Sequence, residues 1–161
     1  MRVLFDGVLR WWERLRSRRR ARRIPPLDVD DPRLVVVVEA FDPAEADSAA
    51  LARSERWDAE RQAVLRHHLR LPAASRAQAA DLLAEEGWLL REQAGHPVGE
   101  DASASTAEAP ASQAAPGDLV ALEAVRVQLL DALHCAQARS RMAGLAARLG
   151  GDALGWDALQ V

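Results

Sequence analysis

The order of its predicted elements places this chain in the α+β class, with a ferredoxin-like sheet of the split β-α-β type and helices on one face. From residue 62 onward the pattern is strand, helix, strand, a low-complexity gap, and again strand, helix, strand. An extra N-terminal βα unit and an amphipathic basic N-terminal helix precede this core. We therefore expect a basic arm over residues 1–25 and a single domain over residues 33–160.

The arm is predicted to be one amphipathic helix over residues 2–23. Its apolar side chains follow helical spacing: Leu4, Phe5, Val8, Leu9, Trp12 and Leu15. Ile24 precedes Pro25, and the residue before a proline disfavours helical geometry, so the helix should end there. Residues 1–25 hold nine arginines and two acids, a net charge of +7, whereas the remainder holds 12 arginines and 22 acids, a net charge of −10.

This basic arm has three interpretations. The one we favour is that its apolar stripe packs on the open face of the protein's own sheet while the arginines stay solvated. The second is an anionic membrane surface, bound through Trp11 and Trp12 together with the basic run. The third, ranked below the membrane, is RNA, whose phosphates the run would neutralise. The run comprises Arg18, Arg19, Arg20, Arg22 and Arg23.

The extra βα unit begins with the β-branched run at residues 34–40, which predicts a strand covered on both faces. Asp42, Pro43 and Glu45 then combine a capping residue, a first-turn proline and a capping-box acid. These signals predict a helix over residues 43–60.

The first split unit starts with a strand over residues 63–71. Leu65, His67, Leu69 and Leu71 alternate with Val64, Arg66, His68 and Arg70, so the two sets should face opposite sides of the sheet. Ser75 and Gln78 form a capping box for a helix over residues 76–86, and Gly87 suits its left-handed C-terminal position. A short strand over residues 88–91 completes the unit.

Residues 92–117 consist mainly of Ala, Ser, Pro, Gly and Glu, and we expect a disordered low-complexity loop. In the next strand, residues 119–129, the apolar positions change parity, which predicts either a bulge near Ala124 or a central strand partly buried on both faces. Asp131 should cap a helix over residues 131–149, which Gly150 and Gly151 end. Residues 153–160 form the last predicted strand.

The sequence contains no pattern that indicates catalysis, a metal or a cofactor. His67 and His68 are adjacent on a strand and His134 and Cys135 on a helix, so each pair should diverge and supply at most one ligand to a shared site. Gly-rich phosphate loops and nucleophile elbows are missing from the sequence. The enzyme alternative, a small-ligand or metal-dependent enzyme, needs several of His67, Asp131, His134 and Cys135 to converge on one pocket. The lone cysteine and the lack of an apolar run of about 20 residues favour a reducing cytoplasm.

Two segments resemble the regulator of ribonuclease E activity B (RraB) family, and together they cover about half of the chain. The first is Arg66-His67-His68-Leu69, a helix, and Glu86-Gly87-Trp88. The second is the final helix with Leu133, Leu145 and Leu149, followed by Gly150-Gly151 and Gly155-Trp156. The resemblance implies a ferredoxin-like, non-enzymatic protein that binds and modulates a partner, which in that family is an RNA-degrading endonuclease.

We therefore expect protein binding with a regulatory outcome. The candidate contact residues are Arg66, His68 and Arg70, on the strand face opposite the leucines, together with Trp88 and Trp156 if solvent reaches them. Arginine and large aromatic side chains most often contribute interface energy. The partner would be another protein or a second copy of this chain.

Overall fold

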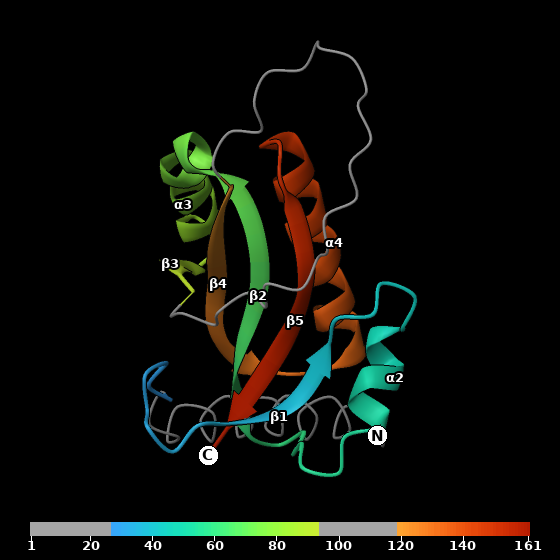
Figure 1. Ribbon diagram of the computed structural model, residues 1–161. Coiled ribbons are helices and arrows are strands. Elements are labelled where there is room, and N and C mark those ends of the chain that lie inside the picture. Colours follow the sequence, from blue (N-terminus) through green and yellow to red (C-terminus); the bar gives the residue numbers. More distant parts are fainter. Residues whose placement is uncertain (1–26, 94–118) are drawn as a thin grey trace, which may run out of the picture.

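A five-stranded antiparallel sheet with three α-helices forms the part of the protein that the computed structural model describes, residues 27–93 and 119–161 (Figure 1). The strand order is β1-β5-β2-β4-β3. The strands are β1 (Val35–Ala40), β2 (Gln62–Pro72), β3 (Leu89–Glu92), β4 (Leu119–Leu129) and β5 (Asp152–Gln160). All five lie within two residues of their predicted positions. The predicted arm and residues 94–117 of the predicted loop lie outside the described residues.

The helices are α2 (Asp47–Ala52), α3 (Arg76–Ala84) and α4 (Ala132–Arg148). The helix predicted over residues 43–60 is present, but its predicted bounds were wrong, because only six residues are helical there. The Asp42 carboxylate accepts a hydrogen bond from the Ala44 amide at 2.8 Å, which fixes a turn rather than a helix start. At the other end, α2 stops at Ala52, and the Ser54 hydroxyl donates a hydrogen bond to the carbonyl of Val37 at 2.5 Å. The chain after α2 therefore lies beside β1.

One of the three predicted helix caps is present, because the first helix starts after Ala46 without a side-chain cap at Asp42. The Asp131 carboxylate accepts a hydrogen bond from the His134 amide at 2.8 Å at the start of α4. The predicted capping box at Ser75 was wrong, because that side chain makes no cap hydrogen bond. After a short 3₁₀ turn (Ala73–Ser75), its hydroxyl instead donates to the carbonyl of Leu149 at 3.3 Å. Ser75 thus joins the beginning of α3 to the end of α4.

The central pair, β2 and β4, is in unbroken antiparallel register from Gln62 opposite Leu129 to Pro72 opposite Leu119. Of the two alternatives for this strand, the bulge near Ala124 is therefore excluded, and the central strand partly buried on both faces is confirmed. The change of parity arises because Leu122–Val125 are all buried, with alternate residues facing the two sides of the sheet. The register shifts of this sheet occur instead in the β1–β5 and β2–β5 pairings.

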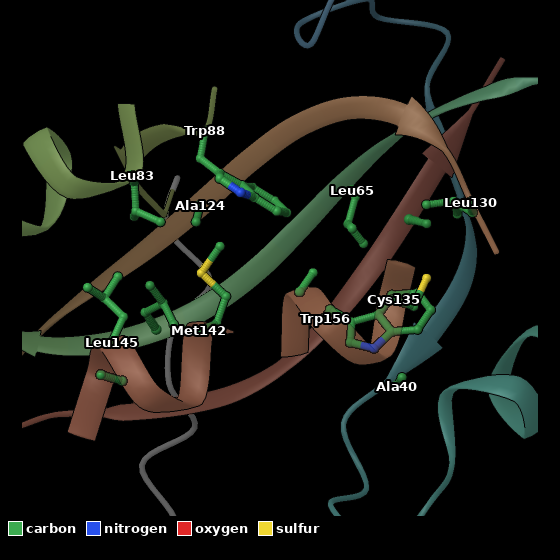
Figure 2. Packing of buried hydrophobic residues seen from close by; sticks show 14 of the residues in the cluster. Ala40, Leu65, Leu83, Trp88, Ala124, Leu130, Cys135, Met142, Leu145 and Trp156 are labelled. Carbon is green, nitrogen blue, oxygen red and sulfur yellow. The ribbon is translucent and has the colours of Figure 1, made fainter. Parts of the chain in front are cut away.

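One face of the sheet packs against the helices and contains the main core. Leu65, Leu69 and Leu71 of β2 are buried there, as the predicted alternation requires. Figure 2 shows Trp88 and Trp156 pointing into this core from different parts of the chain, with Cys135 and Met142 on α4. Each such leucine contributes about 1.5–3 kcal/mol when fully buried.

The other face of the sheet, called here the open face, has no helix among the described residues, but it is not bare throughout. Val64, Val125 and Leu159 form a second buried cluster at one end of it. Leu27, Val29 and Leu34, from the segment that precedes β1, pack against this cluster together with Val36 and Val127. The open face is therefore covered at this end, whereas Arg70, six residues along β2 from Val64, is exposed.

Candidate functional site

An ion pair lies at the centre of the open face, between neighbouring strands. Arg66 of β2 and Asp157 of β5 are register partners. The Nε and Nη2 atoms of Arg66 donate to the two carboxylate oxygens of Asp157, each at 2.7 Å. The side chains retain 20% and 6% of their exposure, so this bidentate pair is largely shielded from water.

His68 occupies the next position along the same face of β2, between two carboxylates. Its Nε2 lies 3.1 Å from Oδ2 of Asp157, and its Nδ1 lies 4.0 Å from Oε1 of Glu123. Glu123 is the register partner of His68 on β4. All three residues are buried, so the imidazole is held between acids contributed by the strands on either side.

The charged network continues to the far edge of the sheet. The Nε of Arg91 on β3 donates to Glu123 at 3.2 Å, and its Nη1 donates to Asp30 at 2.7 Å. Asp30 belongs to the segment before β1 whose Leu27, Val29 and Leu34 pack on the open face. The network therefore links that segment to β3 and β4. We call this set the open-face cluster: Asp30, Arg66, His68, Arg91, Glu123 and Asp157.

The protonation of this cluster follows from its contacts. Burial alone would raise the pKa of Asp157, but the hydrogen bonds from His68 and Arg66 outweigh it and the pKa is lowered. The hydrogen bond to Asp157 also raises the pKa of Arg66. The pair therefore remains ionised. Arg66 and Asp157 neutralise each other and hold each other's side chains in place. The Asp157 carboxylate is therefore not free to act as a nucleophile or a base.

Gly155 makes room for an aromatic side chain beside the cluster. It pairs with His68 and has a φ of +143°, and a Cβ at this position would lie 2.6 Å from the carbonyl oxygen of Ala40 and 2.7 Å from Cδ1 of Phe41. The Phe41 ring accordingly packs beside His68, with 5.2 Å between their centroids. Phe41 is still 45% exposed and extends the cluster toward solvent.

Three of the predicted contact residues lie together. Arg66 and His68 belong to the open-face cluster, and Arg70 lies two residues beyond His68 on the same face, exposed and without an ion pair among the described residues. The alternation in β2 was therefore sufficient to place all three.

The two tryptophans do not meet their condition, because solvent reaches neither. Trp156 is 0% exposed and Trp88 is 4% exposed. The Nε1 of Trp156 donates to Asp47 at 2.8 Å beneath the helices, and Trp88 packs edge-on against His67 with the Arg126 guanidinium 4.3 Å from its ring. Both are core residues and offer no surface to a partner. Trp11, Trp12 and the arm arginines lie outside the described residues.

Asp157, Glu123 and Arg91 were not among the site residues predicted from the sequence. A signal for Asp157 was present, since it follows the apolar Trp156 in a strand and must face the other side of the sheet. Its contact with Arg66 also requires β5 to lie beside β2, which no local pattern specifies.

Of the residues named for the enzyme alternative, only Asp131 and His134 are in contact, as an exposed pair at the start of α4. Cys135 is buried in the core, where burial raises the pKa of its thiol to about 12. His134 lies at the exposed start of α4, with Nδ1 2.5 Å from Asp131. His67 is on β2, and burial lowers its pKa to about 3. Over residues 27–93 and 119–161, the structure holds no group of three His, Cys, Asp or Glu side chains that could bind a metal ion.

In comparisons with known proteins, no family model, no curated protein and no solved structure matches the chain. Among the described helices, none has both the length and the apolar character needed to cross a membrane.

Proposed function

We propose that this chain is a non-enzymatic regulatory module that binds another protein through its open sheet face. We further propose that the fold is the ferredoxin-like, split β-α-β arrangement. The order β5-β2-β4-β3 supports this, with α3 following β2 and α4 following β4 on the same side of the sheet. β1 is then an added edge strand beside β5.

The observation that carries the proposal is the exposed end of the open face, next to the open-face cluster. Arg70 is exposed there, and Phe41 and Leu119 retain 45% and 44% of their exposure. Leu119 and Arg70 are two register positions apart on β4 and β2, and Phe41 packs beside His68. Large apolar side chains around an arginine are typical of interface centres. The ion pairs of the open-face cluster present fixed positive and negative charges that a complementary partner surface could match.

The resemblance to the RraB family supplies a class of partner. In that family the partner is an RNA-degrading endonuclease whose activity the bound protein modulates. Binding through a preformed sheet face needs little rearrangement of this chain, which limits the entropic cost of association.

The test measures RNA cleavage by the purified endonuclease of the same host, with and without added protein. We expect the protein to change the cleavage rate and to bind in a direct titration. Arg70→Glu should weaken binding by about 30-fold, as expected for an interface residue worth about 2 kcal/mol. Arg148→Glu is the matched control, because Arg148 is exposed at the end of α4 on the helical side.

Two outcomes would contradict the proposal. The first is an endonuclease that neither binds the folded protein nor changes its rate. The second is equal loss of binding in both charge-reversal variants, which would show that net charge, and not the open face, determines the interaction.

The basic arm favours a second candidate, a peripheral membrane adaptor. The separation of +7 in residues 1–25 from −10 in the rest concentrates positive charge in a Trp-bearing segment. This candidate predicts co-sedimentation with anionic phosphatidylglycerol vesicles at low salt, and loss of it in the Trp11→Ala/Trp12→Ala variant. A full-length protein that remains in the supernatant would eliminate this candidate.

A further inference from the structure

The first described residue, Leu27, lies on the open face, at the end of the face where β2 begins. Its amide donates to the side-chain oxygen of Gln62, the first residue of β2, at 3.4 Å. Its side chain packs against the buried cluster of Val64, Val125 and Leu159 on this face. The predicted arm joins the chain at this point, so it is tethered to the open face and not to the helical side of the sheet.

The predicted arm helix is long enough to follow the open face from one end to the other. A helix over residues 2–23 would be about 33 Å long. β2 runs from Gln62 to Pro72, which also corresponds to about 33 Å. A helix whose last turn lies near Gln62 can therefore place its first turns over the exposed end of the face, where Arg70 and Leu119 lie.

Apolar side chains on the open face remain exposed and offer contacts to the apolar stripe of the arm. The described part of the chain has seven large apolar side chains that are exposed, and four of them lie on this face: Phe41, Leu89, Leu119 and Leu129. The three leucines are on this face because they are register partners of Val125, Pro72 and Gln62. The Phe41 ring packs beside His68. A helix along the face would remove these side chains from water, which favours its binding.

Acidic side chains gather at the end of the face where the basic run of the arm would lie. Three exposed acids near the start of β2 have no ion pair within residues 27–93 and 119–161: Asp28, Asp58 and Glu60. The side chain of Gln160, at the end of β5, holds the backbone of Asp58 there through two hydrogen bonds. Arg61 offsets one of the three charges. Residues 18–23 carry five arginines, so opposite charges would face each other at this end.

We propose that residues 2–23 form a helix that covers the open face of the same chain in the absence of a partner. Because the arm is tethered at Leu27, its effective concentration at the face is on the order of millimolar, which favours it over a second copy of the chain. A partner protein would have to displace the arm, which would therefore be autoinhibitory. The autoinhibition rests on the proposed function, whereas the docking of the arm does not.

NOEs between the arm and the sheet in the full-length, methyl-labelled protein test the docking. We expect NOEs from the ring protons of Phe5 to the methyl groups of Leu119, because a helix that ends near Gln62 places Phe5 toward the far end of the face. Leu133 is exposed on α4 and should receive none. A mixture of labelled and unlabelled chains distinguishes contacts within one chain from contacts between two copies.

Val8→Asp places a carboxylate in the apolar stripe and should release the arm, with loss of the NOEs to Leu119. Val3→Asp is the matched control, because Val3 lies on the opposite side of the same predicted helix, between Arg10 and Arg14, and the NOEs should remain.

The endonuclease titration tests the autoinhibition. If the arm covers the face about 90% of the time, its release strengthens the apparent affinity about 10-fold. We therefore expect Val8→Asp to bind the endonuclease about 10-fold more tightly than the wild type, and Val3→Asp to bind as the wild type does.

Several outcomes overturn the proposal. Absence of NOEs from the arm to the open face rejects the docking and leaves the apolar stripe to the membrane candidate. NOEs found only between labelled and unlabelled chains replace the arm of the same chain by that of a second copy, and NOEs to Leu133 reject the location. Equal affinities of the wild type and Val8→Asp for the endonuclease reject the autoinhibition. An endonuclease that binds none of these proteins contradicts the proposed function alone, because the NOEs decide the docking without it.

Discussion

Arg66 and Asp157 are 91 residues apart in the sequence, yet their side chains form two hydrogen bonds of 2.7 Å on adjacent strands of the sheet. This contact joins β2, the first strand of one half of the fold, to β5, the last strand of the other. Its position beside His68 and Glu123 places it at the centre of the open face. The same contact therefore holds β2 and β5 together and fixes the side chains at the centre of the proposed recognition surface.

Asp157→Asn should destabilise the fold and loosen the open-face cluster. The amide keeps the shape of the carboxylate but leaves the positive charge of Arg66 uncompensated in a mostly buried site. We expect the free energy of unfolding to fall by about 2–3 kcal/mol, below the usual cost for a fully buried pair because Arg66 keeps 20% exposure. Urea unfolding measures this, and Asp152→Asn on the exposed start of β5 is the control. Equal unfolding midpoints for the two variants would contradict the assignment.

His67 should make the protein less stable as the pH falls. Its folded pKa of about 3 lies below the ordinary value, so the unfolded chain binds a proton that the folded chain excludes. The stability it confers is complete above about pH 6.5 and decreases by about 1.4 kcal/mol per pH unit below it. Burial is the main cause, and the nearby charges of His68, Arg139 and Arg126 act in the same direction, opposed by Asp157.

The measurement is the free energy of unfolding of the wild type and of His67→Leu between about pH 6.5 and 4.5. We expect a smaller slope in the variant, because the substitution removes the group whose pKa is lowered most clearly by burial. Asp157 does not interfere, because its pKa is lowered in the fold and the stability it contributes is lost only as the pH falls below the ordinary pKa of an aspartate, about 4. Identical slopes for the two proteins would show that His67 accepts a proton in the folded state.

Much of the fold could be predicted because the strands carry strong local patterns. The alternation from Val64 to Leu71 separated the two faces of β2, and the core on one side and Arg66, His68 and Arg70 on the other agree with it. The helix after β1 could not be placed, because Asp42 and Pro43 begin a turn as readily as a helix.

The candidate site was only half predictable for a different reason. Its acids come from β4 and β5, and their contact with β2 depends on strand order, which is a property of the whole chain. For the tryptophans the error is the opposite one, because Trp88 and Trp156 were candidate contact residues but are buried in the core. Their residue type is common at interfaces, but Trp156 has a buried hydrogen-bond partner in Asp47, which a type preference cannot reveal.

Cys135 should be unreactive in the folded protein. It is 0% exposed, and burial together with the charges of Asp47 and Asp131 raises the pKa of its thiol to about 12, so the reactive thiolate is nearly absent. We expect a disulfide reagent such as DTNB to label no thiol at pH 8 until denaturant is added. An Ala143→Cys variant is the positive control, because that position is exposed on the same helix and should react at once. Rapid labelling of the wild type would show that α4 opens readily.

The outer edge of β1 is protected by two side chains, and removing them should promote self-association. β1 is an edge strand of the described sheet, and such edges pair readily with other strands. The Ser54 hydroxyl donates to the carbonyl of Val37, and the Arg53 guanidinium donates to the carbonyl of Glu39 while Glu45 holds its Nε at 2.6 Å. Both edge carbonyls therefore have partners within the chain.

The Arg53→Ala/Ser54→Ala variant leaves these carbonyls to water or to another copy of the chain. We expect its stability to fall by only about 1–2 kcal/mol, while sedimentation velocity shows dimers or larger species at concentrations where the wild type sediments more slowly. Glu55→Ala/Arg56→Ala is the matched control, since both residues line the same groove beside β1 without a hydrogen bond to the edge carbonyls of Val37 and Glu39. If the control variant associates as strongly as the test variant, the groove's charges, and not the capped carbonyls, keep the strands apart.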